Sequence, residues 1–314
     1  MIQRILVPLD GSDMAAQVLP HVRALATLFR ARVTFMQATA DEASNVDVGP
    51  GPDFLAFAAA DLASTGIATD TLVAQGPPAD AILDTAEQHS VDLIALCTHG
   101  RGGIRRFLLG SVAANLIGNT TMPLLIVRAK QASVDGVPTQ TIDFRKILVP
   151  LDGSPLAASV LPIVGEIAAK AGATVVLLRA MPEPNEEAAT SSSIQMLRSI
   201  TGVKTEGADG AMADPYASQL EHEREGAQSS LDLAAAALQR SGIQTETIVE
   251  FGSAAETILR VASAQNADLV AMGTHGRSGL RRFLLGSVAD RIVRYSEAPV
   301  LLMPNLAAVN QKSS

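Results

Sequence analysis

The sequence contains little cysteine, no excess of basic residues and no long apolar run. Its single cysteine excludes a disulfide framework and a cysteine-rich metal site, and it fits a reducing compartment. The 24 basic residues face 32 acidic ones, and a formal net charge of -8 argues against binding of nucleic acid through its phosphate backbone. Apolar runs stay below the ~18 residues of a membrane span, and the first residues lack the apolar core of a signal peptide. We therefore expect a soluble cytoplasmic protein that binds neither nucleic acid nor a membrane.

Three blocks of sequence occur twice, in the same order. They are ILVPLDGS at residues 5–12 and 147–154, THGR at 98–101 and 274–277, and RRFLLGSVA at 105–113 and 281–289. Because chance does not produce three repeated blocks in one order, the sequence predicts a tandem duplication. A length of 314 residues agrees with two domains, at roughly 150 residues per domain.

The repeat also predicts where the domains begin and end. The expected units are a first domain over residues 1–128, a polar linker over 129–144, a second domain over 145–304 and a tail over 305–314. The second copy carries extra residues, roughly 182–214, which are rich in proline, glutamate, serine and glycine. Within them Ile194–Ile200 has the pattern of one short helix. The extra residues are either a solvated insertion or a lid or partner-docking element near the strand ends.

Short apolar runs alternate with longer amphipathic stretches in each copy. The runs are Ile5–Leu9, Val33–Ala38, Thr71–Ala74, Leu93–Cys97 and Leu124–Val127, then Ile147–Leu151, Val175–Arg179, Thr247–Glu250, Leu269–Gly273 and Val300–Met303. Such runs are typical of strands buried on both faces of a parallel sheet. Ser154–Ala171 and Ala255–Gln265 have helical spacing, and Pro20 and Pro162 allow a kink in the first helix of each copy. Five strands alternating with four helices predict a doubly wound α/β domain in each copy.

An aspartate and a serine follow the first strand of each copy. Ligands of doubly wound sheets bind beyond the carboxyl ends of the strands, and a carboxylate there accepts hydrogen bonds from sugar hydroxyls or a base amine. Asp10 and Asp152 are therefore candidate ligand contacts. The alternative is structural, with these residues capping the turn and with Ser12 and Ser154 as helix N-caps.

A glycine pattern follows the fourth strand. In the second copy Gly273-Thr274-His275-Gly276 is followed, after nine residues, by Gly286-Ser287-Val288-Ala289. Gly286 and Ser287 are expected to open the last helix, where unpaired N–H groups and the helix dipole favour a phosphate. Arg277, Arg281 and Arg282 add positive charge between the two blocks. The glycines can instead mark turns, but the same spacing in both copies favours a phosphate site.

The ILVPLDGS strand end together with the Gly-x2-Gly-x9-Gly-Ser pattern resembles the universal stress protein family, in its tandem form with two domains in one chain. The resemblance covers both copies apart from the linker, the insertion and the tail. It implies a five-stranded parallel sheet of order 3-2-1-4-5 in each domain. It also implies that the fifth strands meet within the chain as a pseudo-dimer, and that two chains can associate further as a homodimer.

The resemblance further implies that ATP binds, with Mg²⁺ bridging its phosphate oxygens. Asp152 would contact the ribose, Ala180 the adenine, and Gly276 and Gly286 the phosphates. The candidate nucleotide-binding residues of the second copy are Pro150, Leu151, Asp152, Ala180, Met272, Gly273, His275, Gly276, Arg277, Gly286, Ser287, Val288 and Ala289. Their counterparts in the first copy are Pro8, Leu9, Asp10, Ala38, Leu96, Cys97, His99, Gly100, Arg101, Gly110, Ser111, Val112 and Ala113.

The first copy departs from the family pattern at Cys97, where the second copy has glycine. A side chain there narrows the nucleoside pocket or restricts the backbone, so we expect the second copy to be the better nucleotide site. His99 and His275 are interpreted as structural or ligand-lining residues rather than general bases, because no second carboxylate or further histidine recurs near them in both copies. Cys97 is interpreted as a small buried residue rather than a nucleophile.

The leading hypothesis is a stress-response regulator whose state follows ATP occupancy, with a protein client that the sequence does not identify. We expect no catalytic residue and no metal site formed by the protein itself. One alternative is a slow ATP hydrolase or phosphotransfer enzyme, for which the sequence shows no residue dedicated to orienting the attacking group. A second alternative is a holdase or scaffold that works without nucleotide.

Overall fold

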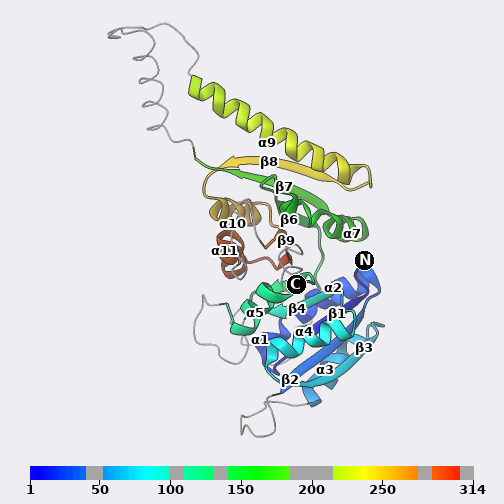
Figure 1. Cartoon of the computed structure of the whole chain (residues 1–314). Coiled ribbons are helices and arrows are strands. Elements are labelled where there is room, and N and C mark those ends of the chain that lie inside the picture. The colour runs from blue at the N-terminus through cyan, green and yellow to red at the C-terminus, as the bar shows by residue number, and fades with distance from the viewer. Residues whose placement is uncertain (40–51, 99–108, 130–140, 184–214, 275–284, 305–314) are drawn as a thin grey trace, which may run out of the picture.

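The computed structural model describes residues 1–39, 52–98, 109–129, 141–183, 215–274 and 285–304 (Figure 1). The first half contains β1 (Arg4–Pro8), α1 (Asp13–Ala16), α2 (Leu19–Phe29), β2 (Arg32–Thr39), α3 (Pro52–Ala63), β3 (Thr69–Gln75), α4 (Pro78–Gln88), β4 (Leu93–Cys97), α5 (Ser111–Asn119) and β5 (Leu124–Val127). The second half contains β6 (Lys146–Pro150), α6 (Pro155–Ala158), α7 (Leu161–Ala171), β7 (Thr174–Met181), α9 (Pro215–Gln239), β8 (Thr245–Phe251), α10 (Ala254–Ala264), β9 (Leu269–Gly273), α11 (Ser287–Tyr295) and β10 (Val300–Met303). The short helix predicted at Ile194–Ile200 lies outside the described residues, as do the other residues of 184–214.

The strands of both halves form one ten-stranded sheet of order β3-β2-β1-β4-β5-β10-β9-β6-β7-β8. Each half therefore has the order 3-2-1-4-5 with parallel neighbours, as predicted. The halves join where β5 and β10 pair antiparallel, with Leu125 opposite Leu301. The expected internal contact of the fifth strands is therefore confirmed. Because this pairing is antiparallel, the strands of the two halves run in opposite directions, and their carboxyl ends point to opposite ends of the molecule along the strand direction.

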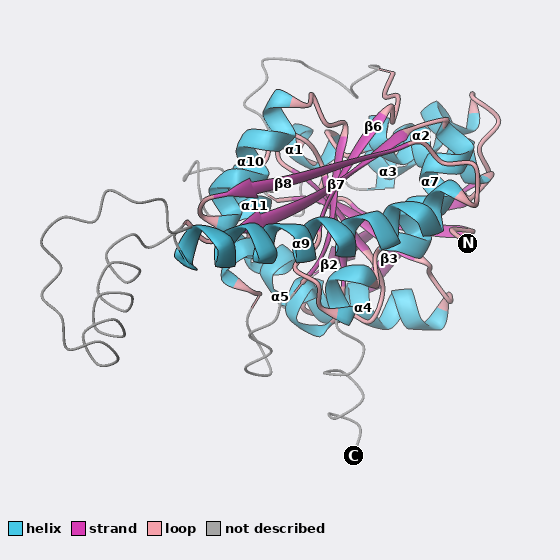
Figure 2. Ribbon diagram, turned by 90° about the horizontal axis from the view of Figure 1, so that it is seen from above, coloured by secondary structure: helices cyan, strands magenta, loops and turns pink. Residues whose placement is uncertain are grey.

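The helices cover the sheet in two layers. Buried residues of α2, α3, α7 and α9 form one continuous core on one face, and those of α4, α5, α10 and α11 form a second core on the other. Figure 2 shows α9 lying along β8 on the outer side of the second half. Both cores contain residues from both halves, so the seam between β5 and β10 is packed as an interior.

The prediction that every strand is buried on both faces is wrong for β3 and β8. Residues of β3 alternate between half-buried and exposed, and those of β8 are mostly half-buried. These two strands are the outer strands of the joined sheet, so each of them pairs with a neighbouring strand on one side only. Charged pairs such as Arg32–Asp70, at 2.8 Å, lie along the β3 edge, where they discourage pairing with another chain.

The first helix of each copy is divided into two, whereas the sequence predicted one helix with proline allowing a kink. The second copy has α6 and α7 within the predicted stretch Ser154–Ala171. Pro162 lies in the first turn of α7, and Pro20 has the same place in α2. Because proline has no N–H and its ring crowds the carbonyl four residues earlier, the helix stops and starts again there.

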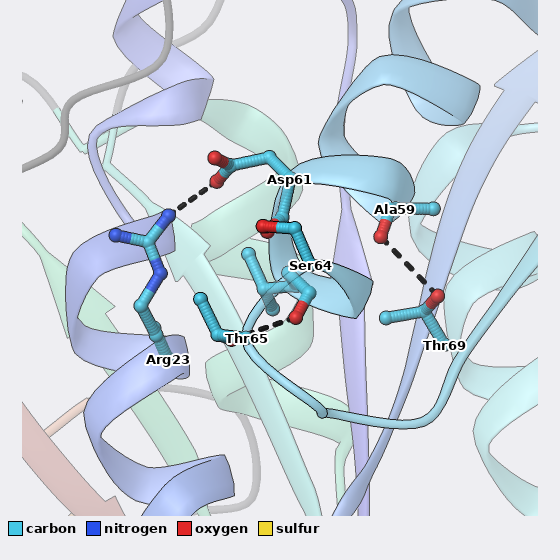
Figure 3. A network of polar contacts seen from close by, with 7 residues as sticks. Arg23, Ala59, Asp61, Ser64, Thr65 and Thr69 are labelled. Atoms are coloured by element: carbon cyan, nitrogen blue, oxygen red, sulfur yellow. Dashed lines mark hydrogen bonds and ion pairs between the residues drawn. The ribbon is translucent and has the colours of Figure 1, made fainter.

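A network of polar contacts ties α2 to α3 in the first half (Figure 3). Arg23 of α2 forms an ion pair with Asp61 of α3, and both side chains are half-buried. After α3 the hydroxyl of Ser64 donates to the carbonyl of Asp61 at 2.6 Å. Gly66 ends this segment with a φ of 83°, and Gly242 after α9 has a φ of 78°, as expected for left-handed helix stops. Within the described ranges, the helices are all too short or too polar to cross a bilayer.

Candidate functional site

The turn after β6 holds Asp152 at the carboxyl end of the strand. Its Oδ1 accepts a hydrogen bond from the amide of Ser154 at 2.8 Å, and the Ser154 hydroxyl accepts one from the amide of Ala157 at 3.1 Å. Both serines predicted as N-caps, Ser12 and Ser154, have this role. The structural alternative for the aspartate is therefore confirmed. It is compatible with ligand binding, because a carboxylate has further acceptor positions.

The same turn recurs in the first half. Oδ1 of Asp10 accepts from the amide of Ser12 at 3.0 Å and from its hydroxyl at 2.6 Å. Asp10 and Asp152 are both half-buried at the carboxyl end of a central strand. Each half thus holds one oriented carboxylate at the edge where doubly wound sheets bind their ligands.

The last helix of each half begins at the same edge. The amide of Gly286 donates to the carbonyl oxygen of Thr274 at 3.0 Å, which fixes the start of α11 beside the end of β9. Among the residues that the structure describes, no side chain caps α11, and Ser287, its first residue, is exposed. The first-turn amides of a helix have no partner within the helix, so this N-terminus favours an anion.

A cavity of about 320 Å³ joins these two elements in the second half. Every predicted residue of the second copy that the structure describes lines it: Pro150, Leu151, Asp152, Ala180, Met272, Gly273, Gly286, Ser287, Val288 and Ala289. Its wall is mostly apolar, and its polar groups are the Asp152 carboxylate, the α11 N-terminus and two hydroxyls. An apolar hollow with a few convergent polar groups is typical of a small-molecule site.

Sequence reasoning missed five residues of the cavity wall. They are Ala157, Leu178, Ala254, Ile258 and Thr274. The first four are apolar residues of α6, β7 and α10 and carry no motif. Thr274 belongs to the repeated THGR block, and this repetition was the signal that could have identified it.

Six predicted site residues lie outside the described residues. They are His99, Gly100 and Arg101 in the first copy and His275, Gly276 and Arg277 in the second. Arg281 and Arg282 lie there too. The contribution of these side chains to either site stays a prediction. Among the described residues, no group of three or more histidines, cysteines, aspartates or glutamates gathers to hold a metal ion.

Gly273 and Cys97 distinguish the two halves at the end of the fourth strand. A Cβ atom on Gly273 would lie 3.0 Å from the carbonyl oxygen of Leu156, so the second half leaves little room for a side chain there. Cys97 packs partly buried against the core of the first half. Burial raises the pKa of its thiol well above the ordinary range, a hydrogen bond from the backbone of Val18 opposes this, and the charge of Asp10 adds to it.

The remaining predicted residues of the first copy occupy the corresponding places. Pro8 and Asp10 end β1, and Ala38 lies near the end of β2. Gly110 is the N-cap of α5, and its amide donates to the carbonyl oxygen of Thr98 at 2.9 Å. Ser111 is exposed at the first position of α5, and Val112 is half-buried. The predicted first-copy residues Leu9, Leu96 and Ala113 are buried.

Fold and crevice together define a tandem doubly wound α/β protein with a ligand-type crevice at the carboxyl ends of the strands of its second half. The model of the universal stress protein family matches residues 1–128 and 143–304. The chain therefore belongs to the universal stress protein family.

Individual relatives agree with this assignment. The chain is 30% identical to universal stress protein MJ0531 of Methanocaldococcus jannaschii, over 41% of this chain and 83% of that protein. It is also 30% identical to universal stress protein YxiE of Bacillus subtilis, over 41% of this chain and 100% of that protein. A solved universal stress protein from Archaeoglobus fulgidus covers 96% of this chain and 98% of its own, with a TM-score of 0.64 and 17% identity, and shares the fold.

Proposed function

We propose that this chain binds ATP in the crevice of its second half and that nucleotide occupancy regulates its association with a protein client. One observation carries the proposal. A single cavity joins an oriented carboxylate, a helix N-terminus that no described side chain caps and an apolar wall. These three features match the ribose, the phosphates and the adenine of one ligand.

The chemistry of each wall suggests how the ligand lies. Leu178, Ile258 and Met272 offer an apolar surface for the adenine. Asp152 is an acceptor for the ribose hydroxyls. The amides that follow Gly286 hold the phosphates through the helix N-terminus. The residues fit a nucleotide with Mg²⁺ on its phosphates, where the ion would neutralise phosphate charge, because the described lining of the cavity has one carboxylate and no cage of oxygen ligands.

Turnover distinguishes the regulator from the slow ATP hydrolase. An enzyme needs a group that orients the attacking water, and Asp152 is the sole carboxylate lining the described cavity. Its Oδ1 already accepts a hydrogen bond from the Ser154 amide. We therefore propose binding without steady turnover. Phosphate release from the purified chain at saturating ATP tests this. Sustained multiple turnovers would contradict the regulator and favour the ATP hydrolase.

The site is tested by substitution at the helix start. We expect Ser287→Ala and Gly286→Val to weaken ATP binding, measured by isothermal titration calorimetry on the full chain. Ser229→Ala on the exposed face of α9 is the matched control, because it makes the same chemical change far along the chain. Loss of affinity only in the crevice variants supports the proposal. If all three variants bind ATP as tightly as the unchanged chain, the proposal is contradicted. Suppression of client aggregation without nucleotide would favour the holdase or scaffold.

The proposal extends to location and assembly. A cytoplasmic protein meets millimolar ATP, and the single cysteine suits a reducing compartment. The pairing of β5 with β10 already joins two family-type domains inside one chain. A further homodimer would therefore use another surface. Light scattering at several protein concentrations, with and without ATP, measures whether that association occurs and whether nucleotide changes it.

A further inference from the structure

Arg179 braces the turn that carries the carboxylate of the second crevice. It lies near the carboxyl end of β7, and its Nη1 donates to the carbonyl oxygen of Leu151 at 3.2 Å. Leu151 lines the cavity and immediately precedes Asp152. The guanidinium is half-buried, so its charge is screened less than the charge of a fully exposed side chain.

The first half has a neutral residue at the same place. The two halves share one register between their first and second strands, which makes Gln37 the counterpart of Arg179. Gln37 is 6% exposed and carries no charge. Arg179 therefore places a positive charge against Leu151, the residue before Asp152, where the first half has a neutral side chain at the same register.

This difference bears on a ligand that carries several negative charges. The Asp152 carboxylate repels phosphate oxygens while it accepts hydrogen bonds from a sugar. A guanidinium held against the preceding carbonyl offsets that repulsion at little cost, because the hydrogen bond already orders the side chain. In the first half Gln37 cannot offset the charge of Asp10.

We infer that Arg179 is a positioning residue that makes the second crevice prefer adenine di- and triphosphates to adenosine, and to a greater degree than the first crevice does. The inference rests on the proposed function of the same crevice and names the ligand class that it selects. A merely structural brace predicts something different. Loss of the brace alone would displace the turn and weaken ATP and adenosine equally.

The test measures binding of ATP, ADP and adenosine to the full chain by isothermal titration calorimetry. Labelling with 8-azido-ATP and peptide mapping assigns each dissociation constant to one half. We expect Arg179→Gln to weaken ATP binding at the second site about fivefold to tenfold, ADP binding less, and adenosine binding less than about twofold. The loss for ATP should shrink as salt is raised, because screening weakens the charge.

Three further variants control the measurement. Arg179→Lys keeps the charge and should retain most of the ATP preference. Gln37→Arg should tighten ATP at the first site, and it carries the test if Arg179→Gln fails to fold. Arg240→Gln removes an exposed arginine just after α9 and should leave all three ligands unchanged.

Two results overturn the inference in distinguishable ways. Equal losses for ATP and adenosine in Arg179→Gln, unaffected by salt, would reduce Arg179 to a structural brace and leave ATP binding in place. Absence of ATP binding by the unchanged chain would overturn the proposed function itself, and the inference with it.

Discussion

The amide of Gly110 donates to the carbonyl oxygen of Thr98 at 2.9 Å, and a Cβ atom on Gly110 would lie 2.7 Å from that same oxygen. The second half repeats the hydrogen bond between Gly286 and Thr274 at 3.0 Å. Both threonines are buried. The start of the last helix is thus pressed against the end of the fourth strand, and this contact sets the distance between the helix amides and the crevice.

We expect Gly110→Ala to lower the free energy of unfolding by about 1 to 3 kcal/mol, because the added methyl group forces the α5 start away from Thr98. It should also weaken nucleotide binding at the first site. Urea denaturation and calorimetric titration measure the two effects. Gly226→Ala is the control, since an added Cβ there meets nothing within 4 Å in exposed α9 and should stabilise by about 0.5 to 1 kcal/mol. A neutral Gly110→Ala would contradict the close contact.

Exchange of the residues that end the fourth strands tests why the two crevices differ. Cys97→Gly should improve nucleotide occupancy of the first site, because it removes a side chain where the second half has none. Gly273→Cys should weaken the second site, because its Cβ would approach the carbonyl oxygen of Leu156 to 3.0 Å. Stoichiometry and affinity from calorimetric titration read both changes. If neither variant alters them, the difference between the halves has another origin.

The thiol of Cys97 should resist modification in the folded chain. Burial raises its pKa, so little thiolate forms at neutral pH. A thiol-reactive disulfide reagent should react slowly with native protein at pH 8 and rapidly in denaturant. Because the chain has one cysteine, the signal belongs to this residue alone. Equal rates in the two conditions would show that the thiol is accessible.

The same raised pKa predicts a pH dependence of stability. Below the unfolded-state pKa of about 8.5 the Cys97 thiol is protonated in both states, so it does not make the free energy of unfolding depend on pH. Above that value only the unfolded chain releases the proton, and the free energy of unfolding falls as the pH rises. Compared with Cys97→Ala, the unchanged chain should lose up to about 1.4 kcal/mol per pH unit above pH 9. Urea denaturation of both proteins between pH 7 and pH 10 measures the difference, and parallel curves would contradict the prediction.

The seam between the halves should be essential for stability. Leu301 of β10 lies opposite Leu125 of β5, and each is 1% exposed. Leu301→Ala should therefore cost about 2 to 5 kcal/mol in the free energy of unfolding. Leu233→Ala is the matched control, because Leu233 is 75% exposed and its truncation should change stability by less than about 0.5 kcal/mol. Similar effects of the two variants would show that the seam contributes little.

Much of the fold was predictable because its signals are local. Ser12 and Ser154 were expected as N-caps, and each accepts the hydrogen bond of a cap. Glycine favours a left-handed stop after a helix, and Gly66 and Gly242, which follow α3 and α9, both have positive φ. Such features depend on a few neighbouring residues, so the sequence states them directly. The strand order came from the resemblance that the repeated motifs carry, and the sheet has that order.

The wall of the crevice was less accessible to sequence reasoning. Asp152 and Gly286 belong to repeated motifs and were found, and both line the cavity. Ala157 and Ile258 were missed, since they reach the cavity from separate helices and resemble any other apolar residue of an amphipathic helix. Their role depends on how those helices pack against the sheet, and no local signal describes that packing.

The sequence by itself determined that the chain is a duplicated, doubly wound α/β protein, with an aspartate after the first strand and a glycine at the start of the last helix of each half. Repeats, periodicity and capping can be recognised from the order of residues along the chain alone. Only the tertiary structure decided that β3 and β8 are the exposed outer strands and that the strands of the two halves run in opposite directions. It alone placed Arg179 against Leu151. The physical reason is that each of these facts depends on contacts between residues far apart in the chain, above all the antiparallel pairing of β5 with β10.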